Sequence, residues 1–258
     1  MTPGIDVSLT EVALALGLTA VAVAVSLWQR AELEQEIGIA VVRSFLQLTA
    51  MGYVIALIFD EDTLLLVVAL VAVMVGFGAL TARSRARAVP GALGPLVAAL
   101  SLAAVSTLGL VVGLGVFEPE PRYLVPVGGM VVGNSMTAAA VALNRLGDEM
   151  RRSAREVEAT LALGATAAQA ARPIVRRSLR SGIIPLVDST KTTGLIFFPG
   201  TMVGMLLAGA EPTDAVRLQM ILLYVLLGAV ALAALVAVGL GQRGFFTPAH
   251  QLRDPPEP

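Results

Sequence analysis

The sequence predicts an all-α, polytopic membrane protein of about seven transmembrane helices, with one long polar helical segment between the fifth and sixth spans. Of its 258 residues, 56% are hydrophobic and only 14% charged, and the mean hydropathy is +0.81. A soluble domain carries nearer a quarter charged residues, so much of this surface must face lipid. The polar side chains are concentrated in one run, residues 144–185, which must lie in water.

Seven apolar stretches approach the roughly 20 residues that a membrane-spanning helix needs. They lie near residues 9–28, 39–58, 63–81, 94–117, 123–143, 183–208 and 215–240. Pro126 and Pro199 fall inside two of them and predict kinked or broken helices. The first ten residues lack the basic region of a cleavable signal peptide, so we expect the first stretch to be retained. Three G-x-x-x-G pairs, which begin at Gly109, Gly129 and Gly200, predict close helix packing.

The arginines fall on one side of this topology. The basic side chains are Arg30, Arg43, Arg83, Arg85, Arg87, those of the central polar run, Arg243 and Arg253, whereas the opposite loops are mainly acidic. The positive-inside rule therefore predicts an external amino terminus and a cytoplasmic carboxyl terminus. No linker or change of composition divides the chain, so we expect a single domain over residues 1–258, with a loose proline-rich tail at 248–258.

The polar run has the pattern of a helix, a glycine break and a second helix. Apolar residues at helical spacing mark one face of the first helix: Met150, Ala154, Val157 and Leu161. Gly164 can end that helix in the left-handed conformation. Thr166 and Gln169 form a predicted capping box that opens the second helix. That helix has an apolar side and a basic stripe: Ala168, Ala171, Val175 and Leu179, and Arg172, Arg176 and Arg180. Either this segment is a solvated loop, or it is a docking surface for a soluble partner.

Polar residues within the spans are candidates for a transport pathway. Asp188 and Lys191 lie three residues apart on one helix face, and such charges are costly in a membrane unless they line a watery path or form a structural ion pair. Both interpretations remain open. Asn134 and Gln47 are predicted to be buried amides, either bonding across helices or lining the pathway. Met130 and Met202 could offer thioether ligands, although core packing is the commoner role of methionine in a membrane.

Several kinds of chemistry are excluded for this polypeptide. There is no Cys, and the one histidine, His250, cannot form a multi-histidine metal site within one chain. There is no phosphate-binding loop, and Lys191 is the only lysine, so a Walker-type ATPase site is absent from the sequence. We therefore expect that this polypeptide does not hydrolyse ATP at a Walker-type site.

Six stretches together resemble the FetB family of ABC-transporter permeases, which is associated with iron export in bacteria and with aluminium tolerance in plants. They are RSFLQL, PVGGMVVGNSM, EATLALGATAAQA, PLVDSTKTTGL, FFPGTMVGMLLAG and HQL. Glu158, Ala159 and Gly164, followed by Ile174, also resemble the cytoplasmic loop through which ABC permeases hold their ATPase. The Leu-Pro ending of that loop is absent here, and Arg176 and Arg177 stand in its place.

The resemblance implies that residues 144–182 are a cytoplasmic coupling-helix segment that docks an ATPase. The implied coupling residues are Glu158, Ala159, Gly164, Thr166, Gln169 and Arg172. It further implies a transport subunit and no enzyme, with no cofactor of its own and no nucleic-acid partner. The implied location is the cell inner (plasma) membrane, where two permease copies with two ATPase subunits that bind ATP and Mg would export iron or another metal ion. Asp188 would be the metal ligand, with Lys191, Asn134, Gln47, Met130 and Met202 along the pathway. The rival hypotheses are an ATP-independent secondary transporter or channel for a small solute, and a structural or receptor-like membrane protein.

Overall fold

The structure is a computed structural model that describes residues 9–61 and 63–253. The chain, predicted as a single domain, divides into two compact units, Met1–Asp62 and Thr63–Pro258. The described residues form helices and no strands, apart from two isolated bridges, so the all-α prediction is confirmed. Each unit is described by itself below.

The first unit consists of two long apolar helices, α1 (Leu9–Gln29) and α2 (Glu34–Glu61). The turn between them is held by Ser26, whose hydroxyl donates to a carboxylate oxygen of Glu34 and accepts the backbone N–H of Leu33. Most apolar side chains of this unit are exposed, Leu18 and Trp28 by about four-fifths. Such an apolar exterior is what a lipid-facing helical hairpin requires.

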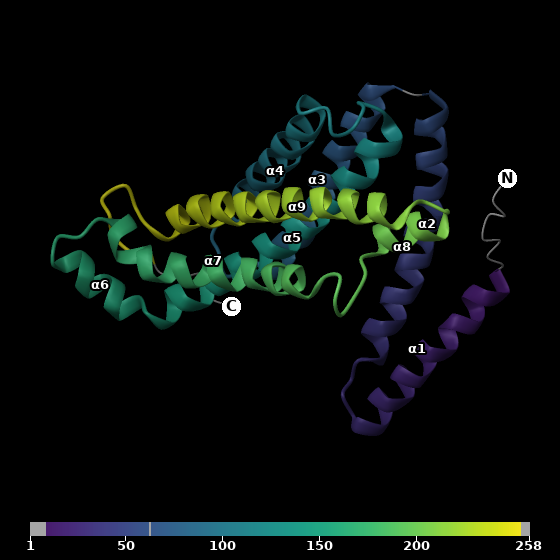
Figure 1. The fold of residues 1–258 in the computed structure, drawn as a ribbon. Helices are drawn as coiled ribbons and strands as arrows, with labels where there is room; N and C mark the ends of the chain where they lie inside the picture. The colour runs from purple at the N-terminus through teal and green to yellow at the C-terminus, as the bar shows by residue number, and fades with distance from the viewer. Residues whose placement is uncertain (1–8, 62, 254–258) are drawn as a thin grey trace. The chain divides into compact units, whose positions relative to one another are not determined.

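The second unit packs its helices around α5, the long central helix (Figure 1). Its elements are α3 (Leu64–Arg85), α4 (Leu93–Gly113), α5 (Pro121–Arg152), α6 (Ala154–Ala162), α7 (Ala167–Thr192), α8 (Gly200–Leu207), α9 (Pro212–Gly241) and a short 3-10 helix, η1 (Gln242–Phe245). Helices α3, α4, α7 and α9 all contact α5. Because α6 reverses the chain, α7 returns antiparallel to α5.

Small side chains allow these helices to approach closely. The buried core along α5 and α9 is rich in alanine, including Ala139, Ala142 and Ala233, each with no exposed surface. The tightest crossing of α5 and α7 lies at Gly182, where a Cβ atom would come within 2.6 Å of the Ala138 carbonyl oxygen. In contrast, the G-x-x-x-G glycines at 109, 113, 133, 200 and 204 have no neighbour within 4 Å of such an atom. The pairs therefore do not mark the close crossings within the described chain.

Six helices of the described residues are long and apolar enough to cross a membrane, and they coincide with six of the seven predicted spans. The remaining stretch, residues 183–208, is not one helix. α7 ends at Thr192, the chain turns through residues 193–199, and α8 follows. Gly194 adopts a positive φ of 86°, and Pro199, which has no N–H to continue a helix, precedes α8. The break expected from Pro199 is thus present, whereas α5 continues through Pro126.

Candidate functional site

The polar run folds as two helices joined by a tight turn. α6 ends at Ala162, and Gly164 takes a positive φ of 90°, as predicted for the residue that reverses the chain. Thr166 is the N-cap of α7, and its side chain accepts the backbone N–H of Gln169 while the Gln169 side chain accepts the Thr166 N–H at 2.8 Å. The predicted capping box is therefore present. It satisfies two backbone N–H groups at the start of α7 with side chains of the same segment.

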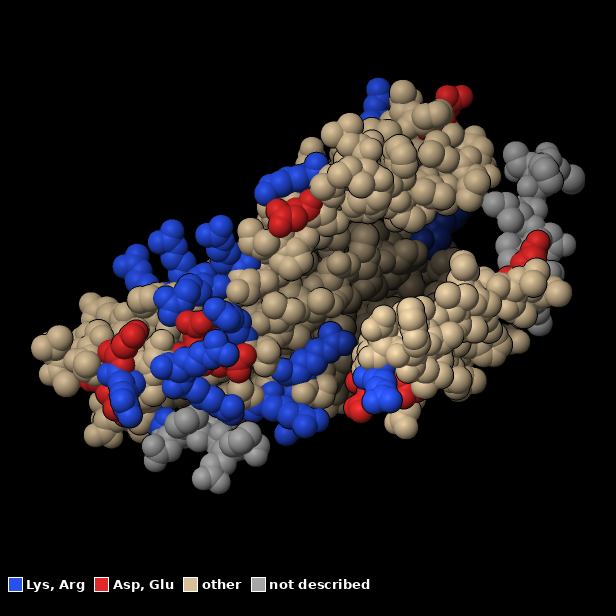
Figure 2. Space-filling view, turned by 90° about the horizontal axis from the view of Figure 1, so that it is seen from below, with Lys and Arg blue, Asp and Glu red and all other residues tan. Residues whose placement is uncertain are grey.

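The six predicted coupling residues all lie on the surface of this segment: Glu158, Ala159, Gly164, Thr166, Gln169 and Arg172. Because Thr166 and Gln169 bond each other, their polar groups shape the turn more than they offer contacts. The tip between the helices presents Leu163, whose surface is 89% exposed. Sequence reasoning missed this apolar residue, since a leucine in a helical pattern is usually buried. Figure 2 shows basic side chains, which the sequence identifies as arginines, gathered at the end of the second unit that contains α6 and the start of α7.

The apolar side predicted for α7 is rotated slightly in the structure. Ala171 is buried, and Val175 and Leu179 pack partly buried against the core, as predicted, but Ala168 is exposed. The buried face instead includes Ala170, Ala171, Ile174, Ser178 and Gly182. Ser178 is polar and Gly182 has no side chain, so hydropathy does not mark either residue as buried. The centre of the predicted apolar face therefore lies about one residue from the centre of the observed buried face. The stripe of Arg172, Arg176 and Arg180 is exposed, as expected.

A buried ion cluster joins α5 to α7 within the run that was predicted to lie in water. Only 12% of the Glu149 side chain is exposed. One of its carboxylate oxygens contacts Arg145 Nη2 at 2.7 Å, and the other contacts Arg177 Nη2 at 2.8 Å and accepts a hydrogen bond from Arg177 Nε at 2.9 Å. Both oxygens are thus satisfied by charged donors. Sequence reasoning missed this clamp because it joins residues 28 positions apart.

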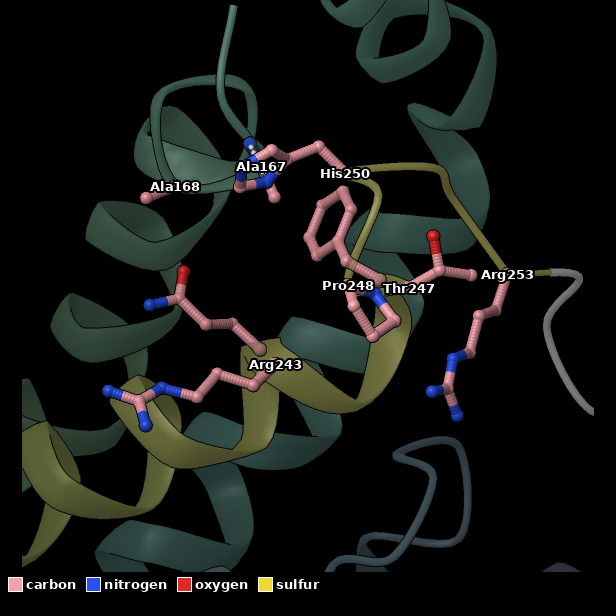
Figure 3. Close-up of a pocket in the computed structure, with 9 residues that line it drawn as sticks. Ala167, Ala168, Arg243, Thr247, Pro248, His250 and Arg253 are labelled. Atoms are coloured by element: carbon pink, nitrogen blue, oxygen red, sulfur yellow. Dashed lines mark hydrogen bonds between the residues drawn. The ribbon is translucent and has the colours of Figure 1, made fainter.

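The carboxyl-terminal strap, residues 246–253, folds back onto the start of α7 (Figure 3). Phe246 is buried, Thr247 N–H donates to the Gln251 carbonyl, and His250 Nδ1 accepts the Ala167 N–H at 3.4 Å. A hollow of about 530 Å³ between strap and helix is lined in part by Arg243. The tail was predicted to be loose from residue 248. Residues 248–253 are held by these contacts instead, and residues 254–258 lie outside the described part.

Asp188 and Lys191 lie together near the end of α7, immediately before the helix break. Lys191 Nζ contacts Asp188 Oδ1 at 3.0 Å, and the two side chains are 66% and 59% exposed. No group of three His, Asp or Glu side chains that could hold a metal ion occurs among the described residues. Asp188 therefore offers a single carboxylate, which would need further oxygen ligands to hold a cation.

The structure brings Asn134 close to this part of α7, but not as a buried amide. Asn134 is exposed, and its Nδ2 donates to the Met130 carbonyl of its own helix at 2.8 Å. It lines a cleft of about 220 Å³ with Ser189, the residue next to Asp188. Gln47 is also exposed, on α2 of the first unit. The predicted cross-helix hydrogen bond is thus wrong for Asn134, whose amide bonds its own helix, α5. The prediction that Gln47 is buried is also wrong.

The two methionines of the predicted pathway are not gathered at this cleft. Met130 is partly buried and packs against the hydrophobic core of the second unit. Met202 on α8 is buried, with 8% of its surface exposed. Both positions fit the packing role that the sequence left open.

Comparison with known proteins places the chain in one family. Residues 9–246 match the model described as "Uncharacterised protein family (UPF0014)". The chain belongs to the UPF0014 family. "UPF0014 membrane protein STAR2" of Oryza sativa subsp. japonica is 40% identical over 93% of this chain and 84% of its own length. "Protein ALUMINUM SENSITIVE 3" of Arabidopsis thaliana is 40% identical over 93% and 88%. "Probable iron export permease protein FetB" of Escherichia coli (strain K12) is 34% identical over 94% and 93%.

The UPF0014 match includes both units and both candidate regions of α7, from the capping box to Asp188. With six helices able to cross a membrane in its described residues, this UPF0014 protein is a multi-pass membrane protein. No solved structure matches the chain.

Proposed function

We propose that this chain is the permease subunit of an ABC transporter that exports iron or another metal ion, driven by ATP hydrolysed with Mg on a separate ATPase subunit. The observation that carries the proposal is the similarity, over 94% of the chain, to a relative named as a probable iron export permease. The wider proposal, in which the permease forms a homodimer with two ATPases, rests on two regions of the structure.

The α6–α7 turn supports the docking of an ATPase. A solvated connecting loop has no need for two helices, a capping box on the second, a left-handed glycine and a clamp that ties the second helix to α5. Here these features hold an exposed surface in one shape, with Leu163 at its tip and Glu158 and Arg172 beside it. A rigid surface binds a partner at a smaller cost in conformational entropy than a mobile loop. The segment therefore suits transmission of force between a soluble subunit and α7.

The end of α7 that contains Asp188 supports a transport pathway enclosed between protein surfaces. Asp188 lies 11 residues beyond Arg177, so the helical rise places it about 17 Å farther along α7. If the Glu149 clamp lies at the cytoplasmic boundary, Asp188 is near the middle of a hydrocarbon core about 30 Å thick. Charged side chains and non-helical backbone at that depth require protein or water around them. A second copy of this chain would supply that cover.

The proposed orientation has the amino terminus outside a bacterial inner membrane. It is supported by the basic end of the second unit, which contains α6 and the start of α7 (Figure 2). A reporter fused after Arg85 or within residues 151–180 should be cytoplasmic, and one within residues 118–121 should be external. The opposite labelling would contradict the orientation.

The decisive experiment is transport in vesicles that contain the full chain and its partner ATPase. We expect uptake of iron, or of another metal from a panel, into inside-out vesicles only when ATP and Mg are supplied. Transport without ATPase or ATP would favour the secondary transporter or channel. Absence of any metal flux, together with an ATPase that fails to bind the chain, would contradict the whole proposal.

Coupling is tested at Gly164, whose φ of 90° is unfavourable for other residues. Gly164→Leu should leave insertion intact but reduce ATP-driven transport relative to ATP hydrolysis, because a left-handed leucine costs about 1–2 kcal/mol and distorts the turn. Gly164→Asn is the matched control, since asparagine tolerates this conformation. Normal transport by Gly164→Leu would show that the shape of the turn is unimportant for coupling.

A further inference from the structure

The cleft beside Asp188 has a chemical character that neither its sequence motif nor the family similarity assigns. It opens between α5, α7 and α9, just beyond the close crossing at Gly182. Its polar lining consists of Asn134 and Thr137 from α5 and Ser189 from α7, and the remaining walls are mainly apolar, including Val230 of α9. Apolar walls leave these three side chains to determine what the cleft can bind.

The hydrogen-bond donors of the α5 side chains are already used by the helix. Asn134 Nδ2 donates to the Met130 carbonyl at 2.8 Å, and the Thr137 hydroxyl donates to the Gly133 carbonyl at 3.1 Å. The amide oxygen of Asn134 and the lone pairs of the Thr137 oxygen remain available. The Ser189 hydroxyl makes no hydrogen bond within the described residues. The cleft therefore presents mainly hydrogen-bond acceptors.

The volume of the cleft indicates how large a ligand these acceptors could bind. A volume of about 220 Å³ is far larger than a bare metal ion. A water needs about 10–15 Å³ of such space, so the cleft has room for a cation together with its first shell of six waters. Waters bound to a cation direct their hydrogens outward and are strong donors, whereas waters around an anion direct their oxygens outward. An acceptor-lined cleft of this size thus matches a cation that keeps its water shell.

We propose that this cleft is a binding site for a hydrated divalent cation, which Asn134, Thr137 and Ser189 hold through its coordinated waters. Asp188, the neighbour of Ser189 on α7, lies outside the lining and is paired with Lys191, so the three side chains hold the cation without a carboxylate ligand. This inference rests on the proposed function and extends it. The transported metal ion would first be held at this cleft with its water shell intact. Binding through water also explains why no cluster of three acidic or histidine ligands is needed among the described residues.

The test measures equilibrium binding of Mn²⁺ to the full chain in lipid nanodiscs, without ATPase or ATP. Hexamminecobalt(III) is the second probe, because its tightly held ammonia ligands imitate a water shell that cannot be shed. We expect Mn²⁺ to bind the wild-type chain and hexamminecobalt(III) to displace it. Failure of this competitor to displace Mn²⁺ would overturn the water-mediated site, and it requires no variant.

Variants then locate the site. Thr137→Val combined with Ser189→Ala should weaken Mn²⁺ binding about tenfold or more, since hydrogen bonds to charged groups contribute about that much each. Asn134→Asp should strengthen it by adding negative charge. Ser181→Ala is the matched control, because that serine of α7 bonds the Arg177 carbonyl and does not line the cleft. Unchanged binding in the double variant, or weaker binding in Asn134→Asp, would overturn the proposal, provided that the melting temperatures match wild type.

Transport separates this inference from the proposed function. Metal transport that depends on ATP but is indifferent to the cleft variants would reject the cleft and leave the transporter proposal intact. Mn²⁺ binding that follows the variants as expected, without ATP-dependent transport of any metal, would support the cation site and reject the transporter proposal.

Discussion

The two ion pairs of α7 differ in almost every physical respect. In the first half of the helix, Arg177 reaches across to buried Glu149 of α5, and Arg145 satisfies the second carboxylate oxygen. Near its end, Asp188 and Lys191 pair within one helix, and both remain more than half exposed. In the first cluster both carboxylate oxygens are paired within this chain, whereas the second leaves charge on an open face.

The surrounding backbone shows the same contrast. From its start to Gly182, α7 is capped by Thr166, packed through Ile174 and closely crossed at Gly182 itself. Beyond Asp188, the helix ends, and Leu195 and Ile196 are at least 79% exposed. A region whose polar groups are satisfied internally is built to hold its shape. A region with exposed charges and exposed apolar side chains in a membrane protein is built to meet lipid, water or another subunit. The following predictions test this division.

The largest effect on function is expected at the open end. Asp188→Asn should lower metal-stimulated ATPase activity and transport roughly tenfold or more, since contacts of a charged group contribute about 1.5–3 kcal/mol. The melting temperature should hardly change, because the Asp188–Lys191 pair joins two residues of the same helix and ties α7 to no other element. If the pair is only structural, Asp188→Asn should fold poorly, and adding Lys191→Met should restore both stability and transport. Full transport by Asp188→Asn alone would remove the role of Asp188 as a ligand.

The largest effect on stability is expected at the clamp. Glu149→Ala leaves Arg145 and Arg177 without their partner, and breaking a buried pair costs about 3–5 kcal/mol, less here because both arginines are more than a third exposed. We expect a lower melting temperature in detergent and loss of assembled complex. Glu158→Ala, at an exposed position of α6, is the control and should melt as wild type does. Equal melting temperatures for the two variants would show that the clamp does not stabilise the fold.

A smaller loss is expected at the crossing between the two ends. At Gly182 an added methyl group would meet the Ala138 carbonyl oxygen at 2.6 Å, so Gly182→Ala should cost about 1–3 kcal/mol through overpacking. Gly133→Ala is the matched control on α5, where such an atom meets nothing within 4 Å. Thermal unfolding of both variants checks the difference. A destabilised Gly133→Ala with an unaffected Gly182→Ala would indicate that the G-x-x-x-G pair is the true contact.

Local rules explain which of these features could be predicted from the sequence. Hydropathy located six helices because each long apolar run must satisfy its own backbone in lipid. The Gly164 turn and the Thr166 capping box depend only on neighbouring residues, so their spacing was sufficient. The Glu149 clamp and the Gly182 crossing depend on the register between α5 and α7, which no local pattern specifies. Asn134 was misplaced for a related reason, since an amide in an apolar run can bond its own helix as readily as another.

The smallest effect is expected at the cap of α7, which also tests whether the docking end holds its shape by itself. Thr166→Ala removes the side chain that accepts the Gln169 N–H, and loss of such a cap costs about 0.5–2 kcal/mol. Hydrogen exchange of the amides at residues 167–170 should accelerate, while exchange near Asp188 stays unchanged, because the Glu149 clamp and the Gly182 crossing lie between the two regions. Thr166→Ser keeps the accepting oxygen and should retain protection. If exchange near Asp188 also accelerates in Thr166→Ala, the two ends of α7 respond as one unit, and the division drawn from their ion pairs does not extend to their dynamics.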